Sequence, residues 1–135
     1  MASAAFALQT AIYARLLGDT ALTAMLGGPR IYDDVPQRAD FPYLTFGQSI
    51  ERDWSTGTED GKEHTVTLHV WSRAAGRKES DDILEAARGL FHNAALVLSG
   101  HRLINLRHDV SDVRRDPDGE TYHGTARFRG VTEPI

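Results

Sequence analysis

The stretch that decides the fold spans residues 31–71 and contains IYDDVP (31–36), FPYLTFG (41–47) and HTVTLHVW (64–71). Apolar and polar side chains alternate along residues 43–50 and again along 63–72, and this period of two predicts two β-strands. The segment 51–62 between them is charged and rich in turn-forming residues, which indicates a loop that faces solvent. The stretch therefore predicts a long hairpin with a large exposed tip.

The segments before and after this hairpin show the pattern of helices. Apolar residues recur at helical spacing along residues 3–17 and along 78–94. Asp19 is placed to cap a short helix at Thr20–Leu26, which Gly27 would end. We therefore expect two helices ahead of the hairpin and one behind it.

Two further strands are expected near the end of the chain. Alternation returns along residues 102–115 and 120–131, and a phase slip in the first of these indicates a bulge near Ser111 and Asp112. The resulting order is α-α-β-β-α-β-β. We expect one α+β domain over residues 1–135, with an antiparallel sheet of about four strands packed on one face by helices.

Composition excludes several classes of function. The chain has 135 residues, a formal charge of −4 and no cysteine, which excludes disulfides, thiolate metal sites and cysteine nucleophiles. It lacks the excess of basic residues that duplex wrapping requires, although arginines alternate with apolar residues near the C-terminus, where we expect a solvated sheet face. No apolar run reaches the length of roughly 20 residues of a membrane helix. The first residues lack a basic leader, so we expect a cytoplasmic protein.

No catalytic or metal-binding pattern stands out. His69, His108 and His123 could meet across the sheet, but the chain has no HxH or HExxH motif, so histidines paired with sheet neighbours are favoured over a metal site. Asp33 and Asp34 are adjacent in an extended segment and should diverge, which argues against a carboxylate pair. No Gly-x-Ser-x-Gly elbow is present. We therefore expect no catalytic residue, no cofactor and no metal.

The quoted motifs resemble a family of small tail-completion proteins of long-tailed phages and phage-like gene transfer particles. The resemblance rests on the IYDDVP segment, on the FPYLTFG strand and on the HTVTLHVWS strand at residues 64–72, each in its order between helices. Leu44 and Phe46 stand where the family pattern favours β-branched residues, which is a mild departure. The resemblance covers most of the chain and carries no catalytic residues.

This resemblance implies a structural protein, a tail terminator that forms a homohexameric ring at the head–tail joint. Such a ring would cap the tail tube, dock the head-side connector or stopper protein, and let DNA pass through its lumen without specific binding, in a particle assembled in the bacterial cytoplasm. No enzyme activity and no membrane contact are implied. From the length and polarity of the loop we hypothesise that it contacts a neighbouring subunit or the tube, with Trp54 as an anchor. The proposed contact residues are Asp53, Trp54, Ser55, Thr56, Glu59, Asp60 and Lys62.

Two other interpretations remain open. The chain could be a different head–tail connector or minor tail protein of similar size. It could instead be a small α+β enzyme or ligand-binding domain, which would require a deep polar pocket.

Overall fold

The computed structural model describes residues 3–135. Met1 and Ala2 lie outside the described residues. They begin the segment in which the sequence shows no basic leader. The elements are α1 (Ala4–Gly18), α2 (Thr20–Leu26), β1 (Ile31–Tyr32), β2 (Tyr43–Asp53), β3 (Lys62–Ser72), α3 (Lys78–Phe91), β4 (His101–Arg115) and β5 (Tyr122–Pro134). Within residues 3–135, no helix combines the length and the apolar character that crossing a membrane requires.

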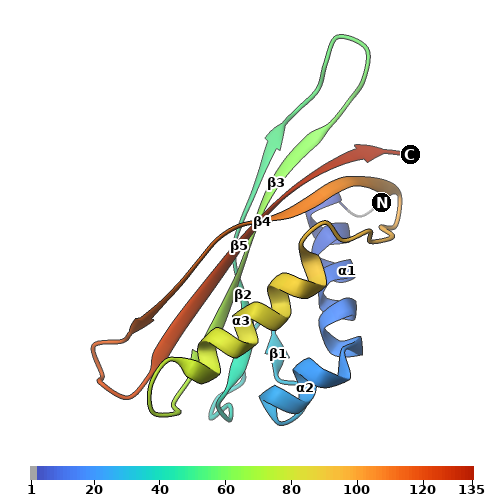
Figure 1. Cartoon of the computed structure of the whole chain (residues 1–135). Helices are drawn as coiled ribbons and strands as arrows, with labels where there is room; N and C mark the ends of the chain where they lie inside the picture. Colours follow the sequence, from blue (N-terminus) through green and yellow to red (C-terminus); the bar gives the residue numbers. More distant parts are fainter. Residues whose placement is uncertain (1–2) are drawn as a thin grey trace.

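The strands form one sheet in the order β1-β2-β3-β5-β4. β1 pairs with β2 in parallel, and the other neighbours are antiparallel. All three helices lie on one face of this sheet and leave the other face bare (Figure 1). The α+β prediction is therefore confirmed, with helices on one face of a largely antiparallel sheet.

The sheet has five strands where about four were expected. The additional strand, β1, has only two residues, which pair with Leu44 and Thr45 of β2. The Leu44 amide also donates to the Arg30 carbonyl at 2.9 Å. Two residues cannot display an alternating pattern, so the segment reads as an extended connector until its hydrogen bonds are seen.

The first two helices begin at the capping residues that the sequence predicts. The Ser3 hydroxyl accepts the Phe6 amide at 3.1 Å, and the Asp19 carboxylate accepts the Leu22 amide at 3.0 Å. α3 ends at Phe91, three residues before the expected end at Ala94. Asn93 takes a left-handed conformation, and its amide donates to the Leu106 carbonyl at 2.8 Å, which turns the chain towards β4.

The core lies between the helices and the covered face of the sheet. Leu68 and Val70 of β3 lie beside Ala126 and Gly124 of β5 and are fully buried. α3 crosses β5 so closely that a Cβ on Gly124 would lie 2.9 Å from Cδ1 of Leu84. Glycine at this position therefore lets the helix pack directly on the strand.

The bulge in β4 lies closer to its start than predicted. The register shifts between His108 and Val110, and a second shift lies between Leu103 and Asn105, whereas the sequence placed a single slip near Ser111 and Asp112. Each shift adds one residue on β4 against β5. The consequence is that the faces of β4 residues cannot be assigned by simple alternation along the whole strand.

Candidate assembly surface: the β2–β3 hairpin

The β2–β3 hairpin extends well beyond the body of the domain. β2 and β3 remain paired out to Asp53 and Lys62, so the predicted loop 51–62 is reduced to a tip of residues 54–61. This end of the hairpin projects past the helices and past the other strands (Figure 1). The strands thus hold the tip away from the core, where folding alone gives it no partner.

The tip is held by its own hydrogen bonds. The Asp53 carboxylate accepts from the Ser55 amide at 3.1 Å and from the Ser55 hydroxyl at 2.6 Å. These two bonds lower the pKa of Asp53 below its ordinary value. The Trp54 amide donates to the Gly61 carbonyl at 2.8 Å, and the Thr56 amide donates to the Glu59 carbonyl at 2.8 Å. The tip is therefore an organised turn that presents a defined surface.

The side chains of the tip are directed to solvent. Trp54 is 57% exposed and stacks on no other ring within residues 3–135. The carboxylates of Glu59 and Asp60 are exposed and form no ion pair in the described part of the chain. The seven predicted contact residues are therefore brought together at one end of the molecule, and their role in assembly stays a prediction.

A second feature, missed by sequence reasoning, is a stack of rings on the helix-free face. The Trp71 ring lies 3.9 Å from the His123 ring at an angle of 9°, and Tyr43 stacks on the other side of Trp71 at 6.4 Å. The Trp71 indole donates to the Thr45 hydroxyl at 3.1 Å. Gly47 makes room for this stack, since a Cβ there would collide with the His69 ring.

Two of the three histidines expected to meet across the sheet do so. Nδ1 of His69 lies 2.6 Å from Nε2 of His123, and burial lowers the pKa of both rings below 6.5. The proximity of His123 lowers the pKa of His69 further. His108 faces the helices instead, where it meets the Phe128 ring at 5.6 Å. Within residues 3–135, no group of three or more potential metal ligands is brought together.

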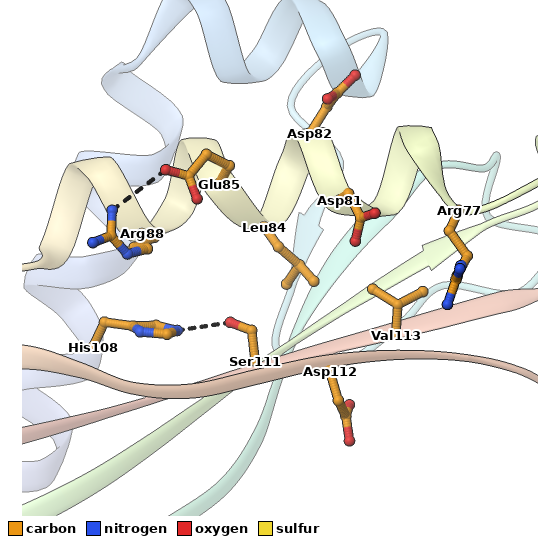
Figure 2. Close-up of a pocket in the computed structure, with 10 residues that line it drawn as sticks. All are labelled: Arg77, Asp81, Asp82, Leu84, Glu85, Arg88, His108, Ser111, Asp112 and Val113. Atoms are coloured by element: carbon orange, nitrogen blue, oxygen red, sulfur yellow. Dashed lines mark hydrogen bonds and ion pairs between the residues drawn. The ribbon is translucent and has the colours of Figure 1, made fainter.

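A groove between α3 and β4 contains a histidine and a serine within hydrogen-bond distance of each other. Figure 2 shows His108 and Ser111 in it, with the His108 Nε2 atom 2.7 Å from the Ser111 hydroxyl. Within the described residues no carboxylate hydrogen-bonds to His108, and Ser111 is exposed. A serine nucleophile requires a base that is itself oriented by a third group. The pair lacks that group, and the groove is better described as a charged surface between helix and strand.

Comparisons with known proteins identify the family of this chain. A family model described as tail completion protein gp17 matches residues 10–133. The chain belongs to the tail completion protein family. A tail completion protein of Bacillus phage SPP1 is 26% identical over 89 residues, which is 66% of this chain and 66% of that protein, just under two thirds of its length. This tail completion protein is therefore a structural tail component of a phage or phage-like particle, as the resemblance implied.

Solved structures support the same family. A chain from the virion of a native gene transfer agent particle is 30% identical, with a TM-score of 0.90 over 98% of this chain and 99% of that chain. Another solved chain, 14% identical with a TM-score of 0.53, shares the fold alone. The family and the fold thus agree over nearly the whole length of this chain.

Proposed function

We propose that this tail completion protein is a tail terminator, which forms a homohexameric ring on the end of the tail tube and docks the head-side connector or stopper protein. In this proposal the ring lies at the head–tail joint and DNA passes through its lumen without specific binding. The protein acts by contact alone and catalyses no reaction. Membership of the tail completion family supports the proposal.

The observation that carries the proposal is the projecting hairpin. Its tip is ordered by the bonds of Asp53 to Ser55, yet Trp54 is 57% exposed and touches no core residue cluster. Tryptophan is enriched among the residues that carry most of the binding energy of protein interfaces. An assembly protein that must bind a tube end or a neighbouring subunit has use for such a projection, whereas an isolated domain has none.

Free strand edges provide a second support. β1 covers only Leu44 and Thr45 of β2, so within residues 3–135 the outer edge of β2 from Phe46 onwards has no neighbouring strand. β4 is the other outer strand of the sheet. A ring requires two different surfaces that meet head to tail, and distinct edges and projections supply such surfaces.

A shortened hairpin tests the proposal. Asp53 and Lys62 are direct partners, so replacing residues 54–61 with Asn-Gly gives a two-residue turn that preserves the register. We expect a folded protein that no longer binds the end of the tail tube, measured by electron microscopy of tubes mixed with the purified variant. Binding equal to that of the unaltered protein would contradict the proposed role of the tip.

A matched control comes from the turn between β4 and β5. Arg115 and Tyr122 are direct partners, so replacing residues 116–121 with Asn-Gly is the same alteration at the opposite end of the sheet (Figure 1). The control should retain tube binding. Parallel mixtures with free tubes and with portal-bearing heads distinguish the alternatives. A head-completion protein would bind the heads and ignore free tubes, a minor tail protein would bind tubes without forming a ring at one end, and an enzyme would bind neither.

A further inference from the structure

The helix-free face of the sheet carries a cluster of arginines whose charge the fold does not balance. Arg107 of β4 lies directly opposite Arg129 of β5, and Arg127 lies two residues away on the same face of β5. Like charges opposite each other across strands destabilise a sheet. We call these three residues the arginine cluster. Arg107 and Arg129 repel each other across the two strands, and a bound anion would relieve this repulsion.

The acids near the arginine cluster compensate it only in part. Asp109 is 3.9 Å from Nε of Arg129, while Arg107 and Arg127 make no ion pair within the described residues. Glu63 lines a hollow together with Arg107 and Arg129. Its Oε1 atom, however, lies 3.7 Å from Nη1 of Arg52 and forms an ion pair there. Asp112 lies further along β4 on the same face. The three guanidinium groups still outnumber the two neighbouring carboxylates, Asp109 and Asp112, so the cluster keeps a positive excess.

The tip of the hairpin carries the opposite excess. Glu59 and Asp60 are exposed and form no ion pair with any described residue, so this acidic tip presents two negative charges beside Trp54. The tip does not reach the arginine cluster of its own chain. Lys62 already lies three residues beyond Thr65, the partner of Arg129, and the hairpin continues outward from there by about 3.3 Å per residue (Figure 1).

We propose that the acidic tip of one subunit, Glu59 and Asp60, binds the arginine cluster of the next subunit in the ring. This inference rests on the proposed function, because it assumes a second copy of the chain as the partner. The tip and the cluster are different surfaces, so the contact is head to tail, which is the kind that closes a ring. The acidic tip and the arginine cluster carry charges of opposite sign, which favours this contact.

Nucleic acid fits the cluster less well. A duplex carries one negative charge per about 1.7 Å of its axis and needs a continuous basic track. Here Glu63, Asp109 and Asp112 interrupt the face, and Asp112 points away from α3 onto it (Figure 2). The two carboxylates of a narrow hairpin tip can reach the arginines between these acids.

Cross-linking tests the contact directly, because the chain has no cysteine of its own. The double variant D60C/R127C leaves Glu59, Arg107 and Arg129 in place, and a short dithiol-specific cross-linker should convert the assembled protein into a ladder of multimers. The matched control D60C/R88C places the second thiol on exposed α3, on the other face of the sheet, and should stay monomeric. Equal ladders, or none from a protein that has visibly assembled, would overturn the inference.

Charge reversal provides the second test. E59K/D60K and R127E/R129E should each weaken assembly on tail tubes about tenfold or more, since several charge pairs are inverted together. Combining all four substitutions in one chain should restore assembly on tail tubes, because the tip is then positive and the cluster negative. If R127E/R129E instead lowers the affinity for a short DNA duplex and the combined variant does not recover assembly, the partner is nucleic acid and the inference is wrong.

These outcomes separate the inference from the proposed function. If the unaltered protein fails to bind tube ends, the tail-terminator proposal fails. If the unaltered protein binds tube ends as a ring and all charge variants do so equally, the ring stands and only the contact between tip and arginine cluster is refuted.

Discussion

Acid should destabilise this protein well before its carboxylates titrate, because three of its histidines are held neutral. His64 is 1% exposed and bonds to the Thr132 hydroxyl at 2.8 Å, while its Nδ1 atom has no partner within the described residues. Burial lowers the pKa of His64, His69 and His123 below their ordinary value of 6.5, although Glu51 opposes the shift at His64 and Asp116 and Asp112 oppose it at His123.

The sign follows from the protons that each state binds. Below pH 6.5 the unfolded chain binds more protons on these rings than the folded chain does, so the free energy of unfolding falls as the pH falls. Above pH 6.5 both states are neutral and the contribution is complete. Each ring that stays neutral can cost at most about 1.4 kcal/mol per pH unit. His64 should approach this limit, and the half-buried His69 should contribute less.

Between about pH 6.5 and 5.5 each ring that stays neutral therefore costs about 1 kcal/mol, so the three rings together cost at most about 3 kcal/mol, against a stability of about 5–15 kcal/mol for a domain. Urea unfolding followed by tryptophan fluorescence at a series of pH values measures it. His64→Gln should remove the largest share of the slope while the rest persists. A free energy of unfolding that stays constant over this interval would refute the assignment of neutral, buried rings.

Two packing and capping features give further predictions. Gly124→Ala should lower the free energy of unfolding by about 1–3 kcal/mol, because its Cβ would press on Leu84 of α3, whereas Gly89→Ala on the exposed face of α3, where a Cβ meets nothing within 4 Å, should not. Asp19→Ala should cost about 1 kcal/mol, since it removes the acceptor of the Leu22 amide at the start of α2. Urea unfolding measures all three variants. An unchanged midpoint for Gly124→Ala would contradict the close packing of Leu84 on β5, and an unchanged midpoint for Asp19→Ala would contradict the cap of α2.

The sequence was sufficient where local chemistry decides the structure. The hairpin follows from alternation, and the caps at Ser3 and Asp19 follow from residue type, as the structure confirms. The exposure of the tip follows from its charges. The hydrogen bond that Ser55 donates to Asp53 is also a local turn contact, of the kind that aspartate and serine commonly form.

The sequence was insufficient where strand register decides the structure. His69 and His123 are 54 residues apart, and their contact depends on the alignment of β3 with β5. The pairing of Arg107 with Arg129 depends on the bulge at Asp109, which lies between Arg107 and the β4–β5 turn and was predicted too far along the strand. A period of two gives the face of each residue but not its partner, so the ring stack and the arginine cluster required the structure.

The central claim is that this tail completion protein closes the end of a tail tube as a ring. Electron microscopy of purified tail tubes mixed with the protein tests it most directly, with class averages taken at the tube ends and along the shaft. The account predicts a sixfold ring at one end only, which disappears when residues 54–61 are replaced by Asn-Gly. Density along the shaft, unoccupied tube ends, or an unchanged ring without the tip would contradict it.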